Sequence, residues 1–468
     1  MKSLLIIFIG AIAVLFAGLG KKEGRNLPLV LLTLAAALGA LIWDITSKTQ
    51  WSFEIEYVSM NMLVFDYVAL AFEGILIIAS IWIFGLFNQK ETVGADLQGL
   101  LLFSLCGGII LTAFTNLVML FLGLEILSIP LYVLAGSRKQ DLKGNEAAIK
   151  YFLMGAFSTV FFLFGCALVY GATGVLDIES IRRSTSMFEH MGAMPSMASV
   201  GIIFILIGLC FKVAAVPFHF WSPDVYEGSP NRATVFMAVV VKIAAFAAFF
   251  RMFSIGFQFA TATWMTTLCV IAAVTIIVGN VLALKQTNVK RTLAYSSVAH
   301  AGYMLLAILA QPENGVWALL LYSVAYAAGS TTIFYLFNKV SANGDESFEA
   351  FNNFGKNNKL AGIALAIAMF SLAGIPITAG FAGKYSLFTA AFADHKWVVI
   401  VALVGSAISI GYYFRIFKNA FFSHNIEIEG VKIESNWLEK IILAMLILVI
   451  LTLGIAPSLI TKFQFVSI

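Results

Sequence analysis

The sequence predicts an all-α protein that crosses a membrane about fourteen times. Of its 468 residues, 60% are hydrophobic and only 12% are charged, and the mean hydropathy is +0.94. No water-soluble domain can bury that much apolar surface in one core. Breaks at Gly, Pro, Asn and charged clusters divide the chain into apolar segments of about 20 residues, the length that spans a bilayer. These observations predict a polytopic membrane protein with almost no soluble part.

The predicted spans follow one another with short connections. The first segment has the composition of a signal peptide, but "KKEGR" follows it directly without a small-residue cleavage site, so we interpret it as a membrane helix. The boundary between the fourth and fifth spans is the least defined, because few residues separate them. The predicted spans are 3–20, 27–43, 62–87, 95–113, 115–136, 146–171, 199–229, 232–255, 262–284, 291–310, 314–338, 359–392, 397–421 and 437–460.

Basic residues predict the orientation of these spans. The connections that follow the odd-numbered spans hold more than twice as many Lys and Arg residues as the opposite side, which includes both termini. Lys and Arg are retained on the cytoplasmic side of a membrane. Both termini are therefore expected on the non-cytoplasmic side, and four lysines that belong to neither side lie within the spans: Lys150, Lys212, Lys242 and Lys384.

Two long spans are interrupted by proline. Span 199–229 carries Lys212 before Pro217, and span 359–392 carries Pro376 before Lys384. Interrupted helices at corresponding places in two halves are typical of ion sites in inverted-repeat transporters. We therefore predict two inverted five-helix repeats, each with one broken helix. The predicted division is 1–93 for a three-helix segment, 94–258 and 259–422 for the two halves, and 423–468 for a surface connection and the last helix.

Four ionisable residues are predicted deep in the membrane. At about 1.5 Å per residue, Lys212, Lys242 and Glu125 come out near the middle of a core about 30 Å thick, and Lys384 is well inside. Each opposes insertion by roughly 3 kcal/mol, about 12 kcal/mol together. Lys150 lies about one turn into its span, from where its side chain can also extend to the surface.

The deep charges do not balance one another. Three deep lysines face one deep glutamate, so ion pairing alone cannot satisfy them. Burial and a neighbouring cation favour a neutral lysine, whereas a nearby carboxylate favours the charged form. A lysine that moves between these conditions takes up and releases a proton, although a purely structural ion pair remains the alternative.

Polar side chains near the breaks extend this hypothesis. His300 in "YSSVAHAGYML" has Tyr295 and Tyr303 nearby, and His219 directly follows Pro217. A histidine can carry protons between lysines, but a lone helical histidine is also often a packing residue. A broken helix frees backbone groups that need water or side chains, so both breaks are predicted water entries.

Other polar residues leave their roles open. Pro130 follows Glu125 by five residues and is equally consistent with a simple kink. Asp66 and Glu73 are expected on one face of span 62–87, with Asp66 near the interface and the role of Glu73 undecided. The stretch "IEIEGVKIES", 426–435, alternates around a glycine and predicts a short surface hairpin.

Several kinds of site are not predicted. The four cysteines lie far apart in apolar runs, so neither disulfides nor a metal site is expected. The chain has no phosphate-binding loop, no dinucleotide-binding glycine motif and no ligand set for haem or an iron–sulfur cluster. We expect no nucleic-acid partner, and the energy for transport must come from a gradient or from partner proteins.

The sequence resembles the antiporter-like membrane subunits of NADH:quinone oxidoreductase (respiratory complex I), which are related to Mrp-type antiporters. The run "FKVAAVPFHFWSPDVYEGSP" is similar to the subunit N family in particular, the counterpart of mitochondrial subunit 2, and "FLGLEILSIPLYVLAG", "EAAIKYFLMGAFST" and "LAGIPITAGFAGKY" match the same family. Related antiporter-like subunits carry a histidine where this chain has Lys242. The resemblance covers nearly the whole chain.

The resemblance implies roles for individual residues. Glu125 and Lys212 would form the pair whose opening and closing drives proton transfer, Lys242 the connecting lysine and Lys384 the outlet lysine. Lys150 and His300 match a lysine and a histidine of the family, which favours a transfer role for both.

The resemblance also implies a setting for the chain. It implies a bacterial inner membrane, with neighbouring membrane subunits K and M as partners. NADH, FMN, iron–sulfur clusters and the quinone, such as ubiquinone, would bind other subunits. A free-standing Mrp-type cation/proton antiporter subunit is the main alternative, and a structural spacer with inert charges is a second.

Overall fold

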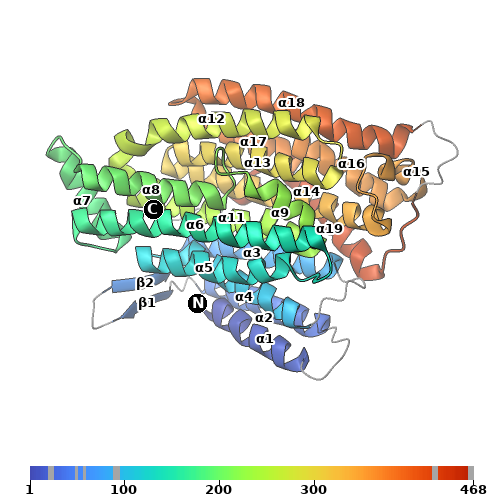
Figure 1. The fold of residues 1–468 in the computed structure, drawn as a ribbon, viewed down its shortest axis with the longest axis horizontal. Helices are drawn as coiled ribbons and strands as arrows, with labels where there is room; N and C mark the ends of the chain where they lie inside the picture. Colours follow the sequence, from blue (N-terminus) through green and yellow to red (C-terminus); the bar gives the residue numbers. More distant parts are fainter. Residues whose placement is uncertain (19–25, 48–50, 56–59, 88–94, 424–430, 462–468) are drawn as a thin grey trace.

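The computed structural model describes residues 1–18, 26–47, 51–55, 60–87, 95–423 and 431–461. The predicted hairpin at 426–435 lies partly outside these residues. Nearly all of the described chain is helical, and the helices run side by side along the long axis of the molecule (Figure 1). Within these described residues, ten helices are long and apolar enough to cross a membrane. The chain is therefore an all-α, multi-pass membrane protein.

The N-terminal region holds two of these ten helices, one shorter apolar helix and one hairpin. Helix α1 is short, and strands β1 and β2 pair antiparallel, with Trp51 opposite Phe65. Asp66 accepts a hydrogen bond from the amide of Ala69 and thereby starts α3. The elements are α1 (Lys2–Gly18), α2 (Leu27–Thr46), β1 (Trp51–Ile55), β2 (Met60–Phe65) and α3 (Tyr67–Leu86).

This region corrects two expectations. The third span starts at Tyr67 rather than at residue 62, because residues 60–65 pair as a strand. Asp66 therefore caps α3 from outside the helix and does not share a helical face with Glu73.

The middle of the chain forms a second group of helices. Helix α7 is a short amphipathic helix that was not predicted; Asp177 caps it, and Ile178 and Ile181 are buried at helical spacing. The predicted seventh span consists of two helices, α8 and α9, separated by residues 213–220. The elements are α4 (Ala95–Ala113), α5 (Leu117–Ala135), α6 (Leu142–Thr173), α7 (Ile178–His190), α8 (Ser196–Lys212) and α9 (Trp221–Gly228), followed by one continuous helical rod: α10 (Asn231–Phe236), η1 (Met237–Val241), α11 (Lys242–Phe250) and η2 (Arg251–Gly256).

The remaining helices complete the bundle. The predicted twelfth span is also two helices, α16 and α17, separated by residues 374–378. The longer elements are α12 (Thr261–Lys285), α13 (Val289–Leu309), α14 (Pro312–Val340), α16 (Lys359–Ala373), α17 (Ala379–Phe392), α18 (Lys396–Phe422) and α19 (Trp437–Ile455), and the short ones are η3 (Gln258–Ala260), η4 (Ser341–Asn343), η5 (Glu349–Phe351), α15 (Phe354–Asn357) and α20 (Ser458–Thr461).

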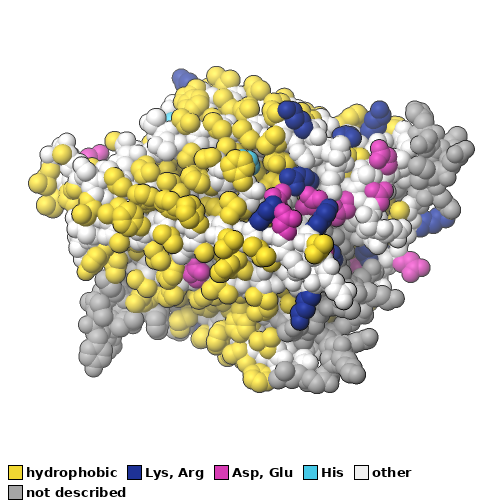
Figure 2. Space-filling view, in the orientation of Figure 1, with side chains coloured by type: hydrophobic (Ala, Val, Ile, Leu, Met, Phe, Trp, Pro, Cys, Tyr) yellow, Lys and Arg dark blue, Asp and Glu magenta, His cyan; other side chains and the backbone are white. Residues whose placement is uncertain are grey.

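The core lies along the rod 231–256, α13 and α14, which are almost entirely buried. Helices α6, α8, α12 and α18 cover this core on the face shown in Figure 2, where hydrophobic side chains dominate. Most charged side chains on that face gather toward the end that carries α9 and α15 (Figure 2). The rod 231–256 carries Lys242 and α13 carries His300, so the fold places these two side chains away from lipid.

Candidate functional site

Lys212 and Glu125 lie at the same internal surface but have separate partners. Lys212 is the last residue of α8 and is only 8% exposed. Its Nζ donates to the hydroxyl of Ser128 on α5, and that hydroxyl donates to the carbonyl of Leu124. Glu125 Oε1 accepts a hydrogen bond of 2.7 Å from Thr159 on α6. Among the described residues no ion pair joins Glu125 to Lys212, so the structure holds the two charges apart.

A small cavity connects these two groups. Its volume is about 20 Å³, which is enough for one water molecule. Hydroxyl groups on two helices, α5 and α6, face it together with the two ionisable side chains. Its polar lining residues are Glu125, Ser128, Tyr132, Ser158, Thr159 and Lys212.

The break after Lys212 is held by neighbouring side chains. Pro217 lies within residues 213–220, and Ala214 adopts a left-handed conformation with φ 59°. The amide of Val216 donates to Thr275 Oγ1 on α12 at 2.9 Å. Free backbone groups inside a membrane need such partners. The break is therefore stabilised by a hydroxyl from a helix far along the chain.

His219 lies in the same break and is 4% exposed. Its Nδ1 is buried and has no hydrogen-bond partner among the residues that the structure describes. The ring of Tyr295 on α13 is 6.5 Å away, centroid to centroid. The structure thus brings His219 and Tyr295 near each other, without a hydrogen bond between them.

Lys242 is buried in the centre of the rod 231–256. Its Nζ donates to both the carbonyl and, at 2.5 Å, the hydroxyl of Ser297 on α13. Ser297 Oγ in turn bonds the hydroxyl of Tyr326 on α14 at 3.0 Å. The hydrogen bonds lead from Lys242 toward α14, where no carboxylate takes part.

His300 lies between two tyrosine hydroxyls. Its Nδ1 is 2.5 Å from Tyr322 Oη, and its Nε2 is 3.0 Å from Tyr413 Oη. The ring centroid of Tyr326 lies 5.1 Å from that of His300, and the centroid of Tyr303 lies 6.0 Å away. His300 is therefore the junction between the Lys242 side and the Tyr303 side.

Lys384 lies just after the second break. Its Nζ donates to the carbonyl of Ala373 at 3.0 Å and to Ser406 Oγ at 3.1 Å. Ala373 is the last residue of α16, so the lysine satisfies a carbonyl that the helix end leaves free. The ammonium also lies 4.9 Å from the ring centroid of Tyr303. Pro376 is in the five-residue interruption that separates Ala373 from α17.

These contacts form a row of buried bases, which we call the lysine row: Lys212, Lys242, His300 and Lys384. From Lys242 to Lys384 the row is linked through Ser297, tyrosine rings and hydroxyls. Within the described chain, no hydrogen bond joins Lys212 or its partner Ser128 to Lys242, although α8 packs against α11. The geometry suits stepwise proton transfer, with a gap between the first and second lysines.

Lys150 is not part of the lysine row. Its Nζ forms ion pairs with Glu146 at 2.6 Å and with Asp224 at 2.7 Å, and its side chain is 39% exposed. Asp224 also binds Arg291. The structure places Lys150 in a charged cluster at the end of the helices, apart from Lys212.

Glu73 is also separate from the lysine row. It is fully buried on α3 and accepts a hydrogen bond from Ser3 on α1. A second buried carboxylate, Glu439, forms an ion pair of 3.0 Å with Lys339. Within the described residues, no group of three or more His, Cys, Asp or Glu side chains is arranged to hold a metal ion.

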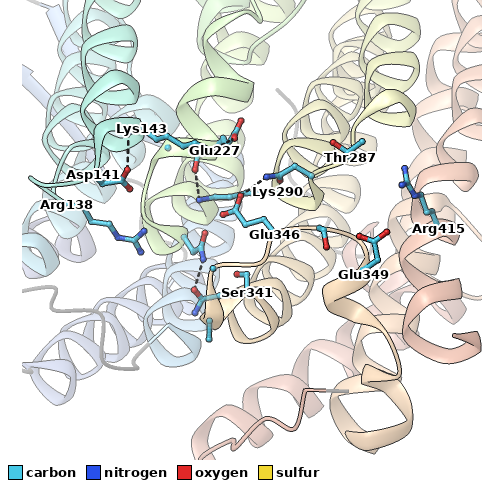
Figure 3. A pocket seen from close by; sticks show the side chains of 17 residues that line it. Arg138, Asp141, Lys143, Glu227, Thr287, Lys290, Ser341, Glu346, Glu349 and Arg415 are labelled. Atoms are coloured by element: carbon cyan, nitrogen blue, oxygen red, sulfur yellow. Dashed lines mark hydrogen bonds and ion pairs between the residues drawn. The ribbon is translucent and has the colours of Figure 1, made fainter. Parts of the chain in front are cut away.

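Sequence reasoning missed the tyrosines that complete the row. Tyr322 and Tyr326 are one turn apart on α14 and both face His300, and Tyr413 comes from α18. The sequence signal that could have found them is the four-residue spacing of Tyr322 and Tyr326, which puts both on one face of a helix. It also missed a polar pocket of about 820 Å³ at the end of the helices, which Figure 3 shows between Lys143, Glu227, Lys290 and Glu346.

Comparisons with known proteins agree on one family. Residues 114–409 match the family described as NADH:quinone oxidoreductase/Mrp antiporter, TM. The chain is 39% identical over 466 residues to the NADH-quinone oxidoreductase subunit N of Cytophaga hutchinsonii, and the match covers 98% of both chains. It is also 39% identical to the subunit N of Trichlorobacter lovleyi, over 80% of this chain and 77% of that protein.

Solved structures share the fold. A chain of respiratory complex I from Thermus thermophilus superposes with a TM-score of 0.83 at 33% identity, covering 98% of each chain. A chain of the Mrp complex from a Dietzia species superposes with a TM-score of 0.85 at 19% identity, covering 98% of this chain and 95% of that chain, which shows a common fold. With relatives this similar over their full length, the chain belongs to the subunit N family of NADH-quinone oxidoreductases, within the wider NADH:quinone oxidoreductase/Mrp antiporter family.

Proposed function

We propose that this chain is a proton-translocating membrane subunit of an NADH:quinone oxidoreductase. Protons would pass through half-channels joined by the lysine row, driven by quinone reduction in other subunits. The observation that carries the proposal is that Lys212, Lys242 and Lys384 are almost fully buried and bind hydroxyls and carbonyls in place of carboxylates. Each such charge costs roughly 3 kcal/mol in the membrane, so the fold keeps them against a large penalty.

The first step would use Glu125 and Lys212. Changing the separation of two such charges from about 4 to 8 Å, at an effective dielectric near 20, changes their interaction by about 2 kcal/mol. A Lys212 that approaches Glu125 gains a proton, and one that moves toward Ser128 releases it. The small cavity between them provides space for the water that carries the proton.

The later steps would follow the lysine row. A proton that reaches Lys242 would pass along the hydrogen bonds of Ser297 to Tyr326. It would then pass His300 and Tyr303 to Lys384 as the outlet, carried by water where only ring contacts join these residues. The breaks at Pro217 and Pro376 would admit water, with His219 and Tyr295 beside the first. Lys150 would act at the entrance; its partial exposure and its ion pairs with Glu146 and Asp224 support this role.

The architecture that supports this route is a pair of inverted repeats. We propose that four shorter apolar helices, Lys2–Gly18, Leu97–Ala113, Ser196–Lys212 and Lys359–Ala373, complete fourteen crossings. Supporting the repeats, α4 packs on α5 as α12 packs on α13, and α6 packs on the first broken helix as α14 packs on the second. The proposed units are 1–93, 94–258, 259–422 and 423–468.

The same proposal includes a membrane and partners. We place the chain in a bacterial inner membrane with both termini on the non-cytoplasmic side; the gathering of charged side chains at the α9 and α15 end supports this orientation (Figure 2). The neighbours would be membrane subunits K and M. NADH, FMN, iron–sulfur clusters and the quinone would bind to partner subunits.

The proposal is tested by replacing Lys212 in the assembled enzyme. We expect Lys212→Ala to reduce proton pumping in membrane vesicles by at least about tenfold, which corresponds to about 1.4 kcal/mol in a barrier. NADH oxidation by a soluble artificial acceptor and subunit assembly serve as controls and should be unchanged. Undiminished pumping in a fully assembled enzyme would exclude the transfer role.

A free-standing Mrp-type antiporter subunit is the alternative. It predicts sodium-dependent proton exchange by vesicles that lack the other subunits of the oxidoreductase. The subunit N relatives, which are twice as similar in sequence as the Mrp chain, favour the oxidoreductase. Co-purification of the chain with NADH oxidase activity distinguishes the two.

A further inference from the structure

The motif "SPDVYEGSP", residues 222–230, builds helix α9, and no residue of it belongs to the lysine row. Helix α9 has eight residues and forms the second part of the first broken helix. It lies between α6 and α13 (Figure 1). The motif therefore connects the break at Pro217 to two helices on either side of it.

Both carboxylates of α9 bind cations on both flanking helices. Asp224 pairs with Lys150 of α6 at 2.7 Å and with Arg291 of α13 at 2.8 Å. Glu227 pairs with Lys143 of α6 at 3.1 Å and with the same Arg291 at 2.7 Å. One guanidinium thus holds both carboxylates, and each carboxylate joins α6 to α13. We call these five residues the α9 clamp.

The backbone at the C-terminal end of α9 is also bound to a neighbouring helix. Lys290 Nζ donates to the carbonyls of Glu227 and Ser229, at 3.0 and 2.7 Å, and these are groups that a helix end leaves without internal partners. Figure 3 shows Lys143, Glu227 and Lys290 side by side at the pocket. A Cβ on Gly228 would lie 2.3 Å from the carbonyl oxygen of Lys143, so α9 touches the backbone of α6 there.

The other end of α9 reaches the surroundings of Lys212. Trp221 Nε1 donates to the carbonyl of Phe211, the residue before Lys212, at 3.1 Å. The Trp221 ring stacks on Tyr151 with centroids 4.8 Å apart, and Lys212 Nζ lies 6.0 Å from the centre of that tyrosine. A displacement of α9 therefore moves groups that enclose Lys212.

We propose that Asp224 and Glu227 are positioning residues, which hold α9 between α6 and α13 and so set the enclosure of Lys212. The inference rests on the transfer role proposed for Lys212. It explains why the chain has two carboxylates and a glycine at this point of a membrane helix. It also means that Lys150 affects the surroundings of Lys212 indirectly, because its ion-pair partner Asp224 lies on the helix that helps to enclose Lys212.

The experiment measures whether the clamp keeps reagents away from the break. Cys210 is fully buried on α8, two residues before Lys212. The assembled enzyme, with Asp224→Asn and Glu227→Gln singly and together, is labelled in membranes with N-ethylmaleimide, and each cysteine peptide is quantified by mass spectrometry. We expect Cys210 to react about fivefold faster in the double variant, the lower range of typical coupling between sites.

The chain contains its own controls. Glu146→Gln removes a carboxylate that also pairs with Lys150, but one that lies on α6 itself, so Cys210 should react at the wild-type rate. Cys106, Cys166 and Cys269 are buried on other helices, α4, α6 and α12, and should also keep their rates. Arg291→Lys keeps the charge without the planar guanidinium, so it should accelerate Cys210 less than Arg291→Gln does.

Two results would overturn the clamp. One is an unchanged Cys210 rate in the double variant; the other is equal acceleration of all four cysteines, which would mean general loosening. Measurements of proton pumping distinguish failure of the clamp from failure of the proposed transfer role. If Lys212→Ala pumps normally, the transfer role fails whatever Cys210 does; if Lys212→Ala abolishes pumping while Cys210 stays protected, only the clamp fails.

Discussion

The two broken helices resemble each other in outline but differ in what surrounds their lysines. Each has a proline in the interruption and a non-glycine residue with positive φ, Ala214 at 59° and Ile377 at 73°. Lys212 precedes its break and shares a small cavity with a carboxylate, whereas Lys384 follows its break and binds a carbonyl and a hydroxyl. Among the described residues, the first lysine thus has a carboxylate at its cavity, whereas the second binds neutral groups only.

This difference assigns different tasks to the two breaks. A charge pair of variable separation suits a step that responds to motion elsewhere in an enzyme. A lysine held by fixed dipoles suits a step that receives a proton from the row and passes it on. The following experiments, from the largest expected effect to the smallest, are designed to break or sharpen this comparison.

Lys384 should be the position least tolerant of change. We expect Lys384→Ala to lower pumping at least about tenfold, because none of its neighbours at the second break replaces its proton. Lys384→Arg should be as inactive, since a guanidinium keeps its charge and does not release a proton. Pumping by vesicles measures both. Restoration by arginine would mean that the charge, and not proton exchange, is what the second break needs.

Glu125 should tolerate change better than Lys384. In Glu125→Gln, Lys212 loses the nearby carboxylate but keeps Ser128 and the cavity, so pumping should fall about fivefold, in the usual range for one lost coupling. Glu125→Asp keeps the charge and should retain more activity. If Glu125→Gln is as inactive as Lys384→Ala, the two breaks are equally strict and the comparison fails.

Tyr322 tests the connection between the two breaks. Tyr322→Phe removes the hydroxyl that bonds His300 Nδ1, and one such hydrogen bond corresponds to about a threefold change in rate. Tyr385→Phe is the matched control, because Tyr385 is exposed on α17. The ratio of pumping to quinone reduction measures the effect. An equal loss in both variants would remove His300 from the route.

Ser128 should have the smallest effect. Ser128→Ala removes the hydroxyl that binds Lys212, but the cavity has room for a water that takes its place, so we expect a change of about twofold or less. Ser104→Ala is the control, since Ser104 of α4 also donates to the backbone of α5, at Leu127, but does not line the cavity at Lys212. A large loss in Ser128→Ala alone would show that the first break, like the second, depends on fixed dipoles.

Much of this site followed from hydropathy alone. Lys212, Lys242 and Lys384 stand out because a cation inside an apolar run has no ordinary explanation, and the structure buries all three. The two helix interruptions were also predictable, because each has a proline within an apolar segment. Membrane helices make such predictions reliable, because a polar group at depth must have a partner.

The missing parts depend on contacts between distant segments. Tyr322 in an apolar helix is indistinguishable from a packing residue until α13 is placed beside it. The partner of Lys150, Asp224, is 74 residues away in the chain. The sequence around Lys150 therefore could not show whether this lysine is free at the surface or belongs to an ion-pair cluster. Asp66 was assigned to a helix because the extended residues before it are as apolar as a span.

The hydroxyl of Thr275 restricts how this protein can change over evolution. It holds the amide of Val216 in the first break, yet it belongs to α12, which precedes the second break. A chimera joined between η2 and α12 would have to bring a hydroxyl to this one position, or leave a backbone amide in the membrane without a partner. Replacement of one part of the chain alone would therefore have to preserve this hydrogen bond.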